Sequence, residues 1–311
     1  MVQENCLKKI VVVCGPTGSG KTATAVNLAK QFDGEVISAD SVAIYKYLDI
    51  GSAKPSKEEM NGIPHHMIDI ISPFDSFSVS DYEIEATKSL TDIFGRGKLP
   101  IICGGTGFYI NSLLYKLSYG KHSANHEVRE KYETILKNHG NMFLHDILRS
   151  VDPETADKLH PNDTVRVIRA LEIFESTGIK KSDIKDDFVP KYDFIAIMPD
   201  FERSVLYERI NKRVDNMFSK GLESEVKNLI DMGVTRDNQS MQAIGYRETL
   251  DALLSNKEIP IEEIKTNSRR YAKRQLTFFR QYKNLIPICA DEEYMQNALK
   301  VVDNFLNNKI I

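Results

Sequence analysis

IVVVCGPTGSGKT, residues 10–22, is the stretch that decides the fold class of this chain. It opens on an apolar, β-branched run, typical of a buried parallel strand, and continues with the G-x-x-x-x-G-K-[ST] pattern of a phosphate-binding loop. Good helix formers fill residues 20–30. A loop between a strand and a helix start presents backbone N–H groups to phosphate oxygens. We therefore predict that a diphosphate or nucleotide is bound by Gly15, Pro16, Thr17, Gly18, Ser19, Gly20, Lys21 and Thr22.

Within this loop, Lys21 adds a positive charge and the Thr22 hydroxyl is expected to bind Mg²⁺. The alternative is a glycine-rich turn without a ligand. No Asn-Lys-x-Asp motif for guanine is present, and the strand predicted at 99–103 ends in two glycines instead of an acidic residue. Asp40 follows so closely behind the loop that it would face a substrate beyond the phosphates. These features disfavour a GTPase and leave a small-molecule kinase or a transferase with a diphosphate leaving group.

Strands and helices alternate outward from the loop. Further short apolar runs predict strands at 35–38, 99–103, 193–198 and 286–289. This order predicts an α/β fold with a P-loop NTPase-like parallel sheet core. We expect the first part of the core at 1–117, a mostly helical insertion domain at 118–190, and the completed core with a helical C-terminal region at 191–311. Helices of that last part are predicted at 203–218, 222–232, 241–254, 261–282 and 292–306.

Composition narrows the class of protein. The 311 residues carry 41 basic and 44 acidic side chains, a net charge of −3, which excludes a generally basic nucleic-acid coat. The four cysteines form no C-x-x-C pair, which excludes a zinc finger built on such pairs and favours a reducing compartment. No apolar run approaches the roughly 18 residues of a membrane span. We expect a cytoplasmic monomer without a signal peptide or a membrane contact.

The most basic segment is residues 265–283, which has no acidic side chain and carries aromatic residues between its lysines and arginines. Cations suit backbone phosphates, whereas aromatic rings and Arg planes suit the unstacked bases of an RNA loop. The alternative is an amphipathic helix whose aromatic side chains belong to the core. In an acidic protein this local excess of charge favours a nucleic-acid site.

Beyond the phosphate loop, a series of short motifs follows in order along the chain. They lie at residues 38–41, 49–55, 63–69, 104–109, 160–163, 165–172, 242–247 and 273–280. Together with the loop they resemble the motifs of bacterial tRNA dimethylallyltransferases (the IPP transferase family), and the resemblance covers nearly the whole chain. The family often has a Trp at one position of the pair Phe278-Phe279, and two phenylalanines preserve an aromatic wall there.

The resemblance implies transfer of a dimethylallyl group from dimethylallyl diphosphate to N6 of adenosine 37, in tRNAs that read codons beginning with U. An exocyclic adenine amine is a poor nucleophile, so this reaction needs a stabilised leaving group and a base for the N6 proton. The phosphate loop with Lys21 and Mg²⁺ suits the first need. Asp40, at a strand end opposite the loop, suits the second. A helix cap or a metal-side carboxylate is the alternative for Asp40.

Two further catalytic residues are implied by the resemblance alone. Thr106 resembles the family residue that hydrogen-bonds near the bridging oxygen and the tRNA, and Arg213 resembles the arginine that grips the diphosphate. Without the resemblance, Thr106 is equally well a helix N-cap, and Arg213 is a solvated cation on a helix. The expected catalytic set is Asp40, Thr106 and Arg213.

We expect the tRNA to contact both the insertion and the C-terminal helices, which would clamp the anticodon stem-loop. The target adenosine must leave the base stack to reach Asp40, and unstacking costs least in a loop. The expected tRNA-binding residues are Asp40, Ser41, Val42, Ala43, Thr106, Arg129, Val165, Arg166, Val167, Ile168, Arg169, Gln242, Ala243, Ile244, Gly245, Tyr246, Arg247, Lys273, Arg274, Gln275, Phe278, Phe279 and Arg280.

The histidines are not expected to bind a metal. His65 and His66 are adjacent, so their side chains point in different directions, and a structural role near the rim of the site is predicted. The surface is the expected place of His122, His126, His139 and His145, and no structural zinc is predicted. Two rival functions are a P-loop metabolite kinase, which would not need the basic segment, and an RNA-binding module with a vestigial phosphate loop.

Overall fold

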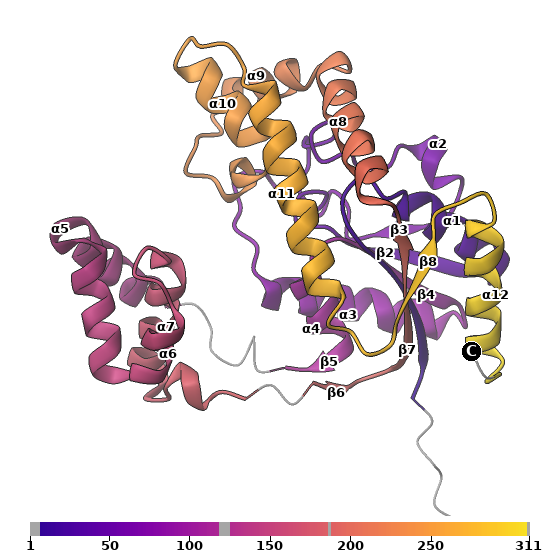
Figure 1. Cartoon of the computed structure of the whole chain (residues 1–311), viewed down its shortest axis with the longest axis horizontal. Coiled ribbons are helices and arrows are strands. Elements are labelled where there is room, and N and C mark those ends of the chain that lie inside the picture. Colours follow the sequence, from indigo (N-terminus) through magenta and orange to yellow (C-terminus); the bar gives the residue numbers. More distant parts are fainter. Residues whose placement is uncertain (1–6, 118–124, 186–187, 310–311) are drawn as a thin grey trace, which may run out of the picture. The chain divides into compact units, whose positions relative to one another are not determined.

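The computed structural model describes residues 7–117, 125–185 and 188–309. The chain divides into two compact units, and each is described by itself. Unit 1 comprises Met1–Leu114 and Pro190–Ile311, and unit 2 is Tyr115–Val189 (Figure 1). The sheet and the phosphate loop belong to unit 1.

Unit 1 is built on a six-stranded parallel sheet of order β3-β2-β4-β1-β7-β8. The strands are β1 (Lys9–Cys14), β2 (Gly34–Ala39), β3 (His65–His66), β4 (Leu99–Gly104), β7 (Asp193–Asp200) and β8 (Leu285–Cys289). Residues 10–14 of the central strand β1 are fully buried, which explains their unbroken apolar sequence. The predicted α/β fold with a parallel sheet core is confirmed.

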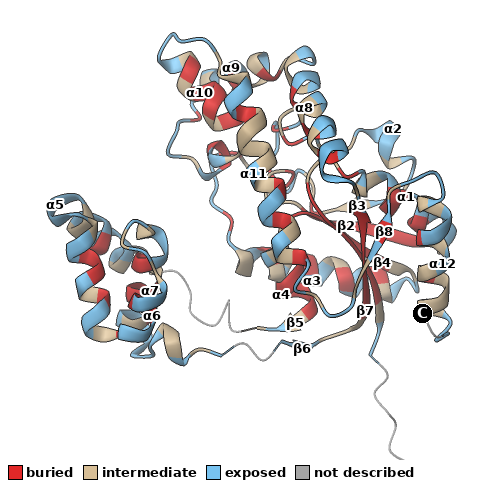
Figure 2. Cartoon of the chain, viewed as in Figure 1, coloured by how far each residue is buried: buried red, intermediate tan, exposed pale blue. Residues whose placement is uncertain are grey.

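Helices cover both faces of this sheet. α1 (Lys21–Gln31) and α12 (Tyr294–Leu306) share one core with alternate residues of the strands, among them Val11 and Val13. α3 (Val79–Gly95) and α4 (Gly107–Leu114) contact β2 and β4 from the other side. Figure 2 shows the buried residues concentrated along the strands and the helix faces that meet them.

The remaining helices of unit 1 are α2 (Lys57–Met60), α8 (Arg203–Ser219), α9 (Leu222–Asp231), α10 (Tyr246–Leu254) and α11 (Ile261–Phe279). α8 and α11 pack against each other through Leu206, Ile210 and Ala272. The helix predicted at 241–254 was wrong at its start, because Gln239–Gln242 forms a 3-10 turn and Gly245 takes a φ of 93° before α10 begins. α11 ends at Phe279, three residues before its predicted end.

Unit 2 is a small helical unit with its own core. It consists of α5 (His126–Val151), α6 (Pro153–Lys158), α7 (Thr164–Thr177) and a 3-10 turn at Lys181–Asp183. α5 is interrupted at Gly140, where the backbone leaves the helical region. Leu144, Leu148 and Leu171 form the centre of the core. The short strands β5 (Tyr115–Lys116) and β6 (Val189–Pro190) pair with each other where the chain enters and leaves the unit.

Candidate active site

A cavity of about 740 Å³ opens at the carboxyl ends of β1, β2 and β4. This is the edge of a parallel sheet where ligands of open α/β folds bind. Every residue that lines the cavity belongs to unit 1, and the polar residues contributed by the phosphate loop are Thr17, Lys21 and Thr22. The cavity therefore has the polar residues of the predicted phosphate-binding loop on one wall.

The phosphate loop is held from within and from α11. Gly20 adopts the left-handed conformation (φ 81°) directly before α1, a conformation that favours glycine. The Pro16 carbonyl accepts hydrogen bonds from Lys21 Nζ (2.7 Å) and Ser19 Oγ (2.8 Å). The Gln275 side chain accepts from the Thr17 backbone N–H (2.9 Å) and donates to the Gly105 carbonyl (3.0 Å). Gln275 is thus a clamp between the loop and the end of β4.

Two cations face this cavity without an acidic partner. Lys21 and Arg213 both line it, and neither forms an ion pair with any residue that the structure describes. Loss of hydration lowers the pKa of Lys21 to about 8, and burial also lowers the pKa of Arg213. The charge of Asp40 offsets this lowering of the two pKa values only in part, so an anion bound between Lys21 and Arg213 would be stabilised.

Asp40 follows β2 and also lines the cavity. Its Oδ1 accepts hydrogen bonds from the backbone N–H groups of Val42 (2.8 Å) and Ala43 (3.2 Å), so the carboxylate caps the turn that follows. Oδ2 makes no hydrogen bond with a residue in the described ranges. One oxygen therefore fixes the carboxylate while the other can accept a proton or a hydrogen bond from a substrate.

Thr106 lies directly before α4, and its carbonyl accepts a hydrogen bond from the Ile110 N–H (3.2 Å) in the first turn of that helix. Its hydroxyl turns instead to Ser41, accepting from the Ser41 N–H (3.1 Å) and lying 3.3 Å from Ser41 Oγ. Thr106 thus joins the turn after Asp40 to α4. Tyr271 on α11 lines the cavity one turn before Gln275, and burial raises its pKa to about 12.

The structure brings many of the expected tRNA-binding residues to the cavity. Those that line it are Asp40, Ser41, Val42, Ala43, Gln242, Ala243, Ile244, Arg247, Arg274 and Gln275. Lys273, Arg274 and Arg280 are exposed, and the guanidinium of Arg274 stacks on Tyr271 with 5.7 Å between its carbon and the ring centre. Phe278 packs edge-on against Phe108 and Phe279.

Four of the expected tRNA-binding side chains are placed differently. Tyr246 and Phe279 are fully buried in unit 1, and Val167 and Ile168 are buried in the core of unit 2. Their side chains pack inside the protein, so a contact of these four residues with RNA would have to involve their backbone. On the same helix as Val167, Val165 is 78% exposed.

The arginines of unit 2 are engaged with carboxylates. Arg129 and Arg169 both pair with Glu172, which is 1% exposed, at 3.2 and 3.0 Å. Arg166 is exposed and lies 3.3 Å from a carboxylate oxygen of Asp163.

The histidines differ from one another. His66 Nε2 lies 2.7 Å from Glu35, and His65 Nδ1 lies 2.9 Å from the Ile63 carbonyl. The surface position predicted for His145 was wrong, because its Nε2 donates to the Ala156 and Leu159 carbonyls at the end of α6 and the residue is 2% exposed. His139 is exposed, whereas His122 and the side chain of His126 lie outside the described residues.

Some cavity residues were not predicted. Ile210 and Met217 line it from α8, one turn either side of Arg213, and Tyr271 lies one turn before Gln275 on α11. Helical spacing from the predicted residues was a signal that could have found all three. In residues 7–117, 125–185 and 188–309, no three His, Cys, Asp or Glu side chains are grouped to hold a metal ion. No helix in these ranges is long and apolar enough to span a membrane.

Comparisons with known proteins identify the family of this chain. The family model described as IPP transferase matches residues 43–282, and that described as isopentenyl transferase matches residues 8–71. A tRNA dimethylallyltransferase of Thermoanaerobacter pseudethanolicus is 46% identical over 96% of this chain and 99% of that protein. The corresponding protein of Halalkalibacterium halodurans is 44% identical over 97% and 98%.

Solved structures give the same result. A tRNA isopentenylpyrophosphate transferase from Bacillus halodurans has a TM-score of 0.74 and 43% identity, over 97% of both chains. A eukaryotic dimethylallyltransferase acting on tRNA has a TM-score of 0.85 and 31% identity, over 98% of this chain and 81% of that one. On the family model and on relatives that match almost end to end, this chain belongs to the IPP transferase family.

Proposed function

We propose that this protein transfers the dimethylallyl group of dimethylallyl diphosphate to N6 of adenosine 37 in tRNAs that read codons beginning with U. The products are the N6-dimethylallyl adenosine and diphosphate. One observation carries the proposal: Lys21 and Arg213 line the same cavity as the half-engaged carboxylate of Asp40. A site for a leaving diphosphate and a proton acceptor therefore share one space.

The reaction follows from what each group does. The N6 amine attacks the allylic carbon, the carbon–oxygen bond to diphosphate breaks, and the N6 proton goes to Asp40. Negative charge that develops on the diphosphate is stabilised by Lys21, Arg213 and the N–H groups at the start of α1. Asp40 also orients the amine, because its Oδ1 is fixed by two backbone N–H groups.

The residues of the cavity fit Mg²⁺ carried by the diphosphate. The Thr22 hydroxyl lines the cavity and makes no hydrogen bond with another described residue, so it is free to act as a ligand. Mg²⁺ commonly takes few protein ligands and completes its shell with phosphate oxygens and water. When bound, it neutralises charge on the leaving group.

The tRNA supplies an adenosine that must leave the stack of the anticodon loop to reach Asp40. We infer that exposed cations of α11 and of unit 2 hold the anticodon stem-loop while residues 242–247 border the flipped base. Because tRNA is the substrate, the cytoplasm is the inferred location.

The test is incubation of the purified protein with dimethylallyl diphosphate, Mg²⁺ and an unmodified tRNA, followed by mass spectrometry of anticodon-loop fragments. We expect a gain of one isoprenyl unit on the adenosine 3′ of the anticodon. Phosphorylation of a small molecule by ATP, with no change in the tRNA, would favour a kinase. No change in the tRNA, together with a cellular role that Lys21→Ala leaves intact, would favour an RNA-binding module with a vestigial phosphate loop.

A further inference from the structure

Residues 49–54 form an irregular loop that borders the cavity beside Arg213. Hydrogen bonds and ion pairs from several other segments of unit 1 hold this loop in place. Gly51, Ser52 and Lys54 of this loop line the cavity. The Ser52 carbonyl accepts a hydrogen bond of 3.0 Å from Arg213 Nη2. No other hydrogen bond joins this guanidinium to a described residue. The position of the Ser52 carbonyl therefore sets the direction in which Arg213 points.

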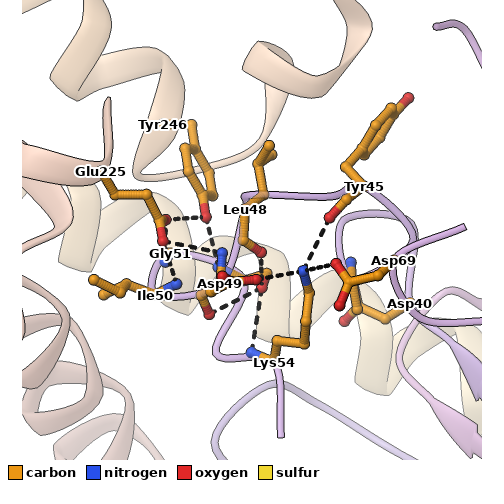
Figure 3. A network of polar contacts seen from close by, with 12 residues as sticks. Asp40, Tyr45, Leu48, Asp49, Ile50, Gly51, Lys54, Asp69, Glu225 and Tyr246 are labelled. Carbon is orange, nitrogen blue, oxygen red and sulfur yellow. Dashed lines mark hydrogen bonds and ion pairs between the residues drawn. The ribbon is translucent and has the colours of Figure 1, made fainter. Parts of the chain in front are cut away.

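Glu225, in the first turn of α9, holds the backbone of this loop (Figure 3). Its Oε2 accepts from the N–H groups of Asp49 (3.0 Å) and Ile50 (2.8 Å), and its Oε1 accepts from that of Gly51 (3.3 Å). Three successive backbone N–H groups thus converge on one carboxylate. Such bonds to an ionised acceptor are stronger than bonds between neutral groups.

Tyr246, the first residue of α10, completes the clamp. Its hydroxyl donates to Glu225 Oε1 (2.5 Å) and accepts from the Ser52 N–H (3.3 Å). The ring lies directly over Gly51, where an added Cβ would stand 2.5 Å from Tyr246 Cε2. Burial and the Glu225 carboxylate raise the pKa of Tyr246, which keeps the hydroxyl protonated as a donor. Glycine at position 51 is therefore required by the close approach of this ring.

The far end of the loop is fixed separately. Lys54 Nζ donates to the Tyr45 carbonyl (2.9 Å) and pairs with Asp49 (2.6 Å) and Asp69 (2.5 Å). Ser52 Oγ donates to the Leu48 carbonyl at 2.6 Å. With Glu225 and Tyr246 at its start and Lys54 at its end, the loop has little freedom to move the Ser52 carbonyl.

We propose that Glu225 and Tyr246 are positioning residues that act through this loop on Arg213. They touch neither the cavity nor a substrate, and they fix the carbonyl that aims the guanidinium at the diphosphate. This inference rests on the proposed function insofar as Arg213 binds the diphosphate. Tyr246 belongs to the segment 242–247, so the clamp also joins the wall inferred to border the tRNA base to the diphosphate site.

The test measures binding of inorganic pyrophosphate with Mg²⁺ by calorimetry, together with KM for dimethylallyl diphosphate. Glu225→Gln and Tyr246→Phe are each expected to weaken pyrophosphate binding about tenfold, the effect of losing one charge-assisted hydrogen bond. The same changes made in an Arg213→Ala protein should weaken binding no further, because residues that act through a common partner are not additive.

Two matched controls separate positioning from a general loss of contacts. Glu223→Gln alters the same helix but only an exposed pair with Lys227, and Tyr132→Phe removes a tyrosine–glutamate hydrogen bond in unit 2. Both should leave pyrophosphate affinity unchanged. Thermal unfolding establishes that each variant is folded at the assay temperature, and Tyr246→Phe, which loses only a hydroxyl, carries the test if Glu225→Gln does not fold.

An unchanged affinity in folded Tyr246→Phe, or an equal loss with and without Arg213, would overturn the positioning role. Failure of the unaltered protein to prenylate tRNA would instead overturn the proposed function. The two failures are therefore distinguishable, since pyrophosphate binding is measured without tRNA.

Discussion

Two sets of basic side chains expected to bind RNA differ in what they contact within the protein. Lys273, Arg274 and Arg280, on or next to α11, make no ion pair with any described residue. In unit 2, Arg129 and Arg169 share the buried carboxylate of Glu172. Turning either guanidinium fully toward a phosphate would weaken the pairing of the buried Glu172, and that is costly. The first set is free for a nucleic acid, whereas the second first stabilises the packing of helices.

The largest effect is expected from removing the carboxylate that the arginines of unit 2 share. Glu172→Ala should lower the free energy of unfolding of unit 2 by about 3 kcal/mol, because it removes the buried carboxylate that Arg129 and Arg169 share and an acceptor for the Asn125 N–H. Urea unfolding and hydrogen exchange in α5 and α7 would measure it. As a control, Glu154→Ala disrupts an exposed pair with Lys158 and should change stability by less than about 0.5 kcal/mol. An equally small loss for Glu172→Ala would show that this pairing is not structural.

The next effect concerns Asp40, which lines the cavity and uses only one of its carboxylate oxygens in hydrogen bonds with described residues. Asp40→Asn keeps an oxygen for the Val42 and Ala43 N–H groups but removes the carboxylate that we propose accepts the N6 proton. We expect kcat to fall roughly 10²-fold or more while pyrophosphate affinity stays nearly constant. Single-turnover transfer and calorimetry would separate the two quantities. A collapse of pyrophosphate affinity would assign Asp40 to the metal side of the site.

A third prediction concerns Lys21, the cation of the phosphate loop, which makes no ion pair with a described residue. The pKa of Lys21 lies at about 8, so this side chain is charged below that pH and neutral above it. Because the charged form binds the anion, the Kd for pyrophosphate should rise up to about tenfold per pH unit above pH 8. Calorimetry from pH 7 to 9.5 measures the slope, and Lys21→Ala should lack it. A flat profile in the unaltered protein would contradict this role.

The smallest effect compares the two sets directly. Arg274→Ala should weaken tRNA binding a few-fold and reduce the salt slope of log K by about one, as loss of one phosphate contact does. Arg129→Ala should reduce that slope less, because Arg129 is engaged with Glu172. Filter binding over a series of salt concentrations provides both slopes. Equal slopes for the two variants would remove the distinction between free and paired cations.

Much of the fold was predictable because its signals are local. The β1 run, the glycine spacing of the loop and the apolar runs of β2, β4, β7 and β8 each identify an element within a few residues of sequence. α3 and α4 were not recognised, and the two-residue strand β3 is too short to leave a pattern. Family membership was also evident from the sequence, since its motifs follow one another in order.

What sequence could not provide depends on contacts between distant segments. His145 is buried because α6 ends against it, and nothing near His145 in sequence indicates this. Glu225 looks like an ordinary acidic residue in a first helical turn, yet its partners are backbone N–H groups more than 170 residues away. The burial of Val167 and Ile168 is likewise decided by which face of α7 meets α5.

The pairing of β5 with β6 has a practical consequence. Because β5 and β6 pair, the chain leaves unit 1 and returns to it at adjacent points. No residue that lines the cavity belongs to unit 2, which lies between these points in the sequence. Replacing unit 2 with a short glycine-rich linker would leave every residue around the cavity in place, and the shortened enzyme would show whether prenyl transfer depends on the RNA contacts proposed for unit 2. Its activity on short oligonucleotides and on whole tRNA would measure that dependence.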